Sequence, residues 1–336
     1  MTVPDVVVTS ARTPAWRSAD AWRRLFRDQP IVPLLFLLAA LVLLLVAIQP
    51  GILNRPQAWV TATVRFATPL ALLAACQTLT MLTGGIDLSV ATIASMSAYV
   101  MATQVPSQGD LVAIAMALLL AAFVGLVNGI GVGVFKVQPL IMTLGTGLVA
   151  LGVLTVYQQY VLTSGSKVPE SVATIGSGTT FGFFPNALFV LIPVAAVIIV
   201  GLRRSGYGRM LFAVGDNPIA ARLTGVRVWQ VLIAVYVISG LLAGIAGIVL
   251  TGVSKAATLN VADAFLLPSV AAAVIGGTSI FGGRGGYTGS IVGALILTVL
   301  LSLLTALNAP APIRQIVYGL IILGVAAAYA RVTGET

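Results

Sequence analysis

Long apolar runs separated by short polar segments dominate this chain. A helix needs about 20 apolar residues to cross the hydrocarbon core of a bilayer, and ten runs reach or approach that length. They are residues 31–48, 58–82, 86–103, 111–135, 140–162, 186–202, 229–253, 264–281, 287–307 and 313–330. The third and eighth runs are short, so either can be a tilted or broken helix that does not cross fully. The pattern predicts an all-α, polytopic membrane protein with about ten transmembrane or partly spanning helices.

The composition agrees with a membrane location and leaves no room for a soluble domain. Only 8% of the residues are charged and 59% are hydrophobic, whereas soluble domains carry about 25% charged residues. The mean hydropathy is +1.07. No segment outside the apolar runs is long enough to bury a core of its own. We therefore expect a cytoplasmic N-terminal segment (1–30), one transmembrane domain (31–331) with a cytoplasmic loop (203–228), and a cytoplasmic C-terminal tail (332–336).

The distribution of the 18 cationic residues predicts the orientation of the chain in the membrane. Cytoplasmic loops carry an excess of Lys and Arg. With ten spans and a cytoplasmic N-terminus, Arg65 falls inside the second span and only Arg55, Lys167, Lys255 and Arg314 lie outside. The other thirteen are cytoplasmic: Arg12, Arg17, Arg23, Arg24, Arg27, Lys136, Arg203, Arg204, Arg209, Arg222, Arg227, Arg284 and Arg331. We expect both termini to be cytoplasmic.

Several kinds of chemistry have no residues to support them. The chain contains no histidine and a single cysteine, Cys76, so neither a metal site nor an intrachain disulfide is indicated. None of the three lysines follows a glycine as in a phosphate-binding loop. We expect a protein that is not an enzyme and binds no cofactor. If it performs work, another subunit or an ion gradient supplies the energy.

The cytoplasmic loop 203–228 contains the signature of a short capped helix. Asn217 can accept hydrogen bonds from amides at a helix start, and Pro218 fits the first helical position. The following residues, which include Ala220, Ala221 and Arg222, favour a helix, and Gly225 suits a left-handed stop. A helix of two turns is marginal in water, so it needs a surface to lie against. That surface is either the membrane or a cytoplasmic partner.

The order of several motifs resembles the permease subunits of bacterial ABC importers for ribose and other simple sugars. This group also serves branched-chain amino acids and nucleosides. The resemblance covers about residues 68–325 and rests on Gly84, Gly85, Asp87 and Ser89; Asn128, Pro139, Thr143 and Gly145; Gly208, Arg209, Gly215, Asp216, Asn217, Pro218, Ala220, Ala221, Arg222 and Gly225; Gly276, Gly277, Thr278, Gly282, Gly283, Arg284 and Gly285; and Arg314, Gln315, Tyr318 and Gly319.

The resemblance implies a function and a set of partners. The helix after Asn217 looks like the coupling helix that inserts into the ATP-binding subunit, so Asn217, Pro218, Ala220, Ala221, Arg222 and Gly225 are the expected coupling residues. A family member assembles with two ATPase subunits or one duplicated ATPase, which use ATP and Mg²⁺. It also has a second permease, identical or related, an extracytoplasmic sugar-binding protein, and membrane lipid around it; no nucleic acid is expected. The expected substrate is a monosaccharide or related polyol, and the alternative is a nucleoside or a branched-chain amino acid.

Two glycine-containing segments are candidates for hinges or helix breaks. Gly84 and Gly85 permit unusual dihedral angles or close approach. Asp87 or Ser89 can cap the helix that follows, and the alternative for Asp87 is a sugar or gating contact. Gly276 and Gly277 are expected in a cytoplasmic turn between packed helices, because this segment lacks the strand and helix of a dinucleotide site.

Polar residues within the spans are candidates for the substrate path. They are Gln77, Asn128, Thr143, Thr146 and Gln158. Each can instead bond a neighbouring helix or its own backbone. A gradient-driven transporter is less favoured, because acidic residues are nearly absent from the spans.

Gly125, Gly129 and Gly133 recur at a spacing of four and favour close helix packing. The pattern of 125–153 is echoed in 293–325, which hints at an inverted repeat.

Overall fold

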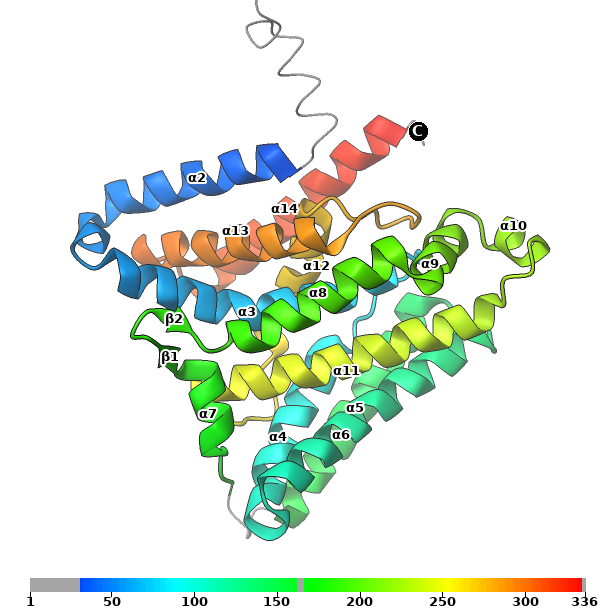
Figure 1. Ribbon diagram of the computed structural model, residues 1–336, viewed down its shortest axis with the longest axis horizontal. Coiled ribbons are helices and arrows are strands. Elements are labelled where there is room, and N and C mark those ends of the chain that lie inside the picture. The colour runs from blue at the N-terminus through cyan, green and yellow to red at the C-terminus, as the bar shows by residue number, and fades with distance from the viewer. Residues whose placement is uncertain (1–30, 162–165, 334–336) are drawn as a thin grey trace, which may run out of the picture.

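The computed structural model describes residues 31–161 and 166–333. The expected N-terminal segment 1–30 and most of the expected C-terminal tail lie outside the described residues. The fold is almost entirely helical (Figure 1). Its helices are α2 (Ile31–Ile48), α3 (Pro56–Met81), α4 (Val90–Gln108), α5 (Asp110–Gly133), α6 (Pro139–Val161), α7 (Glu170–Ser177), α8 (Leu188–Arg204), α9 (Gly206–Asp216), α10 (Pro218–Leu223), α11 (Val228–Ser254), α12 (Leu266–Ile275), α13 (Tyr287–Ala306) and α14 (Ala311–Thr333), with 3₁₀ turns η2 (Pro50–Asn54) and η3 (Asp263–Phe265).

Each of the ten predicted apolar runs contains a helix, so the all-α polytopic fold is confirmed. Among the described residues, six helices are long and apolar enough to cross a bilayer, namely α2, α3, α5, α6, α11 and α13. The pair α8 and α9, bent by 70° at Ser205, makes a seventh if it is counted as one span. The eighth run is only partly helical, because α12 has 10 residues. At about 1.5 Å per residue, α12 is too short to cross a hydrocarbon core of about 30 Å.

The third run differs from its prediction at its start. Its helix, α4, begins at Val90 rather than at Ile86 and continues to Gln108. Residues 82–89 form a loop, which we call the 82–89 loop, and Gly84 within it has a φ of 77°. A positive φ is costly for residues with a side chain, so the helix break predicted at Gly84 is present.

Helix α11 is the central element of the bundle and packs against α5, α3 and α4. The predicted close packing of the α5 glycines is confirmed, because Gly125, Gly129 and Gly133 each lie against the α11 backbone. A side chain at Gly125 would collide with the carbonyl oxygen of Tyr236, and a Cβ at Gly129 would lie 2.7 Å from the Cα of Ile233. On the other side of the bundle, α13 packs against α2, α12 and α3.

The two ends of the bundle carry different structures (Figure 1). One end carries α7 and a hairpin of two short strands, β1 (Thr179–Thr180) and β2 (Phe184–Pro185), which pair antiparallel. The Oγ1 of Thr61 in α3 donates a hydrogen bond of 2.7 Å to the carbonyl of Phe183 and anchors this hairpin. The opposite end carries α9 and α10 (Figure 1). The bundle therefore presents α10 away from the hairpin.

The contact between α5 and α11 yields a stability prediction. Gly125→Ala should lower the free energy of unfolding by about 1–3 kcal/mol, because the added methyl group has no space against the α11 backbone. The matched control is Gly152→Ala in α6, where no atom lies within 4 Å of an added Cβ. Thermal unfolding of both variants in mild detergent measures the difference. Equal melting temperatures would contradict the packing of these two helices.

Candidate functional site

The chain turns sharply at Ser205 and forms two consecutive short helices. The Oγ of Ser205 accepts a hydrogen bond of 2.9 Å from the amide of Gly208 and caps α9. Asn217 ends α9 and caps α10, because its Oδ1 accepts bonds of 3.0 and 2.9 Å from the amides of Ile219 and Ala220. Pro218 occupies the first position of α10. The cap predicted at Asn217 is confirmed.

The end of α10 also follows the prediction. Gly225 has a φ of 90°, the left-handed conformation expected of a helix stop. The amide of Gly225 donates to the carbonyl of Arg222, and that of Val226 donates to the carbonyl of Ala221, both at 3.0 Å. Both ends of the six-residue helix α10 therefore carry capping hydrogen bonds from neighbouring residues.

The side chains of α10 divide into an inward and an outward set. Ala221 is 4% exposed and packs into the core. Ile219 and Leu223 are 72% and 84% exposed, although both are large and apolar. Ala220 and Arg222 are also exposed. The two alanines grouped by the sequence thus have different surroundings, and only Ala220 is available to a partner.

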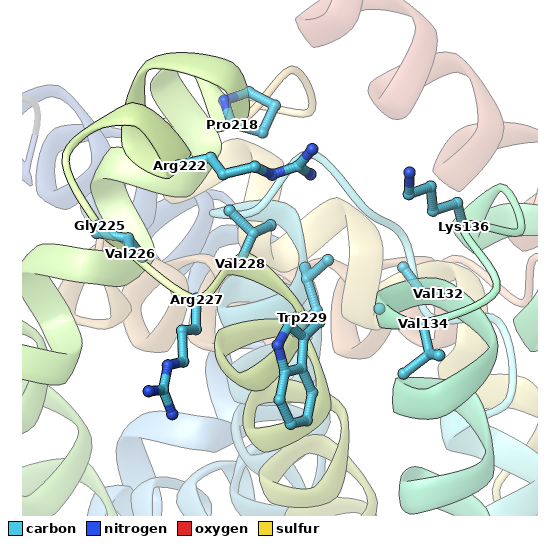
Figure 2. A pocket seen from close by; sticks show the side chains of 12 residues that line it. Val132, Val134, Lys136, Pro218, Arg222, Gly225, Val226, Arg227, Val228 and Trp229 are labelled. Carbon is cyan, nitrogen blue, oxygen red and sulfur yellow. The ribbon is translucent and has the colours of Figure 1, made fainter.

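A cationic groove lies beside α10 (Figure 2). Its volume is about 830 Å³, and it separates α10 and the start of α11 from the end of α5. Arg222 extends across it toward the side that carries Lys136, while Arg227 points away (Figure 2). No acidic residue lines the groove. The groove therefore presents the positive charges of Lys136 and Arg222 next to the exposed apolar side chains of α10.

A second constellation, which we call the Asp87 network, is buried in the bundle next to the 82–89 loop. The Oδ1 of Asp87 accepts hydrogen bonds from the amide and the hydroxyl of Ser89, at 3.0 and 2.5 Å. Its Oδ2 accepts one of 2.8 Å from the hydroxyl of Ser239 in α11. All three residues are fully buried. The carboxyl group thus joins the loop to the central helix of the bundle.

Three further polar residues complete the Asp87 network. Gln77 in α3 donates to the carbonyl of Asp87 at 2.8 Å. Asn128 in α5 donates to the Oγ of Ser89 at 2.8 Å and accepts from Thr146 in α6. Thr143 in α6 accepts from the amide of Leu88 at 3.0 Å and donates to the carbonyl of Ile86. The network therefore ties α3, α5, α6 and α11 to one loop.

The structure brings together four of the five residues proposed from the sequence for the substrate path. Gln77, Asn128 and Thr143 are fully buried within the Asp87 network, and Thr146 lies at its edge. Gln158 lies near the other end of α6, apart from the network. Because these polar groups are occupied by one another, this arrangement favours helix-to-helix bonding over direct contact with a substrate.

Asp87 has a different role from the helix cap considered from the sequence. Helix α4 starts after Ser89 without a side-chain hydrogen bond at its cap. Asp87 instead bonds to Ser89, before the first helical residue, and to α11. Capping requires a side chain that reaches free amides inside the first turn. Here the carboxylate of Asp87 accepts hydrogen bonds from Ser89 and Ser239 instead of from those amides.

The other candidate break, Gly276 and Gly277, lies where α12 ends. Gly277 has a φ of 88°. A Cβ at Gly276 would collide with the backbone of Gly289 and Ser290, so α12 and α13 approach closely there. The turn between packed helices that the sequence predicted is present.

One residue of the Asp87 network, Ser239, was not identified from the sequence. Ser239 is a single small polar residue within an apolar run, and Tyr236 lies three residues before it in α11. The hydroxyl of Tyr236 is buried without a hydrogen-bond partner among the described residues. It packs on Gly85, where a Cβ would lie 2.6 Å from it. A polar residue one helical turn from a tyrosine is a weak signal, since both are common in membrane helices.

A multi-helix bundle of membrane-spanning length, with a short capped helix at one end, defines a polytopic membrane protein. Residues 59–326 match the family described as the permease component of the branched-chain amino acid transport system, and the chain belongs to this family. It is a permease subunit of an ABC-type importer, a multi-pass protein of the inner membrane and a transport component rather than an enzyme.

Curated relatives agree with this family. The ribose import permease protein of Bacillus subtilis strain 168 is 34% identical over 263 residues, which cover 75% of this chain and 78% of the relative. The fructose import permease protein of Rhizobium meliloti is 34% identical over 235 residues, which cover 67% of this chain and 64% of the relative. The autoinducer 2 import system permease protein of Escherichia coli O9:H4 (strain HS) is 31% identical over 295 residues, which cover 85% of this chain and 84% of the relative. No solved structure matches the chain.

The contrast between Ser239 and Tyr236 can be measured. Ser239→Ala should lower the free energy of unfolding by about 1–3 kcal/mol, because it leaves one oxygen of the buried Asp87 carboxyl group without its donor. Tyr236→Phe should have no effect or raise stability, because it removes a buried hydroxyl that has no partner. Thermal unfolding of the two variants tests both expectations. A Tyr236→Phe protein as unstable as Ser239→Ala would show that the hydroxyl is hydrogen-bonded.

Proposed function

We propose that this permease imports a monosaccharide or a related polyol, driven by separate ATPase subunits. The names of the ribose and fructose import permeases support the sugar, and both cover about two thirds or more of the chain. Import is the direction in all three relatives named above. The observation that carries the mechanism is α10, a helix capped at both ends that presents Ile219 and Leu223 to the surface.

The geometry of α10 suits it to dock on an ATPase subunit. Two large apolar side chains exposed side by side outside the predicted spans favour contact with a partner, and Ile219 and Leu223 project from a helix whose ends are already stabilised. Asn217, Pro218 and Gly225 then maintain the shape of the docking helix, while Ala220 and Arg222 lie on its exposed surface. Ala221 fixes the helix to the permease.

The proposed complex has two permeases, identical or related, two ATPase subunits or one duplicated subunit, and an extracytoplasmic sugar-binding protein. ATP and Mg²⁺ bind to the ATPase subunits, and this chain needs no cofactor of its own. The excess of cationic residues on one side supports a cytoplasmic location of α10 and of both termini. The hairpin of β1 and β2 then faces the binding protein.

The orientation can be tested with cysteine variants. The native Cys76 is buried, so it should not react with a membrane-impermeant maleimide. Leu223→Cys should be labelled only in inverted membrane vesicles, and Phe181→Cys, at an 87% exposed position of the hairpin, only in intact spheroplasts. Labelling of both positions from the same side would contradict the proposed topology.

Docking by α10 can be tested by co-purification with the ATPase subunit. Leu223→Glu should weaken the complex by about 30-fold or more, because it places a charge at an apolar anchor of the interface. Leu111→Glu is the control, since Leu111 is 81% exposed but starts α5, away from α10. Equal recovery of the ATPase with the two variants would reject α10 as the docking element.

Transport itself is tested in proteoliposomes that contain the permease, its ATPase and the binding protein. Uptake of radiolabelled ribose, fructose, a nucleoside and leucine should be compared with and without ATP. We expect ATP-dependent uptake of a sugar. Uptake that proceeds equally without ATP would reject the ABC mechanism, and ATP-dependent uptake of leucine or the nucleoside alone would reject the sugar.

A further inference from the structure

Three glycine-containing segments from distant parts of the sequence meet at the base of α9. They are the start of the 82–89 loop, the last residues of α9, and the turn before α13. The amide of Gly283 donates a hydrogen bond of 3.1 Å to the carbonyl of Leu82. A side chain at Gly215 would collide with that same carbonyl oxygen and would lie 2.7 Å from the amide nitrogen of Gly283. We call this contact the glycine junction.

The glycine junction is a contact of backbone on backbone. A Cβ at Gly282 would lie 2.6 Å from the carbonyl oxygen of Gly215 and 3.1 Å from the amide nitrogen of Gly84. A Cβ at Gly283 would lie 3.1 Å from the Cα of Asp216. Gly282 and Gly283 have φ values of 95° and 69°, so their conformation as well as the space around them favours glycine. Without side chains to rearrange, such a contact transmits a displacement with little loss.

The glycine junction lies between the docking helix and the Asp87 network. On one side, Asp216 is the last residue of α9, and Asn217, the next residue, caps α10. On the other side, Leu82 begins the loop that carries Asp87 and Ser89. From there the hydrogen bonds of the Asp87 network reach Asn128 in α5, Thr143 in α6 and Ser239 in α11. A continuous set of contacts therefore runs from α10 to three long helices.

One buried hydroxyl group near this route, that of Tyr236, lacks a hydrogen bond among the described residues. This hydroxyl packs on Gly85. A shift of the 82–89 loop that brought a carbonyl to this hydroxyl would satisfy it, and such a gain would favour a second position of the loop. The 82–89 loop is thus firmly attached to its neighbours, and a hydrogen bond to Tyr236 would stabilise a second position of the loop.

We propose that Gly215, Gly282 and Gly283 are positioning residues that make α10 and the 82–89 loop move as one body. A displacement of α10 by the ATPase then passes through the glycine junction to Asp87, and from Asp87 to α5, α6 and α11. This inference rests on the proposed function of α10 as the docking helix. It assigns the glycine junction a mechanical role and gives Asp87 the role of a link rather than a substrate contact.

The test uses the permease in complex with its ATPase and binding protein. Gly215→Ala should lower the amount of sugar transported per ATP hydrolysed by at least about fivefold, the lower end of typical coupling effects. Gly206→Ala, in the same helix, is the control, because the nearest atom to its added Cβ is a mobile side-chain atom of Arg209 at 3.8 Å. A Gly215→Ala complex that keeps the wild-type ratio of transport to hydrolysis would overturn the proposal.

A second measurement on the permease alone separates this proposal from the docking function. Hydrogen exchange of the amides in the 82–89 loop should be faster in Gly215→Ala by about fivefold or more, because the attachment of the loop to α9 is lost. It should be unchanged in Gly206→Ala. Unchanged exchange in Gly215→Ala would overturn the junction even if α10 docks. If the wild-type permease fails to bind the ATPase, the proposed function fails while the exchange experiment still tests the junction.

A variant at the far end of the route covers the case in which Gly215→Ala does not fold. Ser239→Ala removes the bond between Asp87 and α11 and should lower the ratio of transport to hydrolysis in the same direction. Where both single variants fold, their double variant should lose less coupling than the two separate losses combined, since both interrupt one route. Retained coupling in Ser239→Ala, or independent effects of the two substitutions, would contradict the route through Asp87.

Discussion

A chain that breaks a helix inside a membrane bundle must pair the exposed backbone groups with protein, because hydrocarbon offers no hydrogen bonds. The 82–89 loop meets this requirement residue by residue. The carbonyl of Leu82 pairs with Gly283, the amide and carbonyl of Asp87 with Gln77, and the amide of Leu88 with Thr143. The position of α4, the approach of α6 and the polar residues of α3 all follow from this one break.

The partners that satisfy the break also determine what the bundle can do. Polar side chains at the centre of this permease are hydrogen-bonded to one another, so they form a structural joint between the described helices. The docking helix at one end and the loop at the centre are connected through backbone contacts at Gly215 and Gly283. Force applied at the surface therefore reaches the middle of the protein without passing through flexible side chains.

The sequence predicted the helices well, because every helix that spans a bilayer needs about 20 predominantly apolar residues. It also predicted α10 from Asn217 to Gly225, since the caps of a helix are local interactions between neighbours in sequence. It did not predict the Asp87 network. The partners of Asp87 lie 2, 10 and 152 residues away, and only the fold brings Ser239 to the carboxylate. The break at Gly84 was predicted, but the start of α4 was placed at Ile86 rather than Val90, because Ile86 and Leu88 continue the apolar pattern into the loop.

The separation of 152 residues between Asp87 and Ser239 has a consequence for biosynthesis. At about 5–20 residues per second, ribosomes produce Ser239 roughly 8–30 seconds after Asp87. During that interval α3 and α4 are already made, while the carboxyl group at their junction lacks its partner in α11. The insertion machinery or water must solvate Asp87 until α11 arrives, and Leu82 waits still longer for Gly283. The completion of the central joint is thus among the last events in the assembly of this subunit.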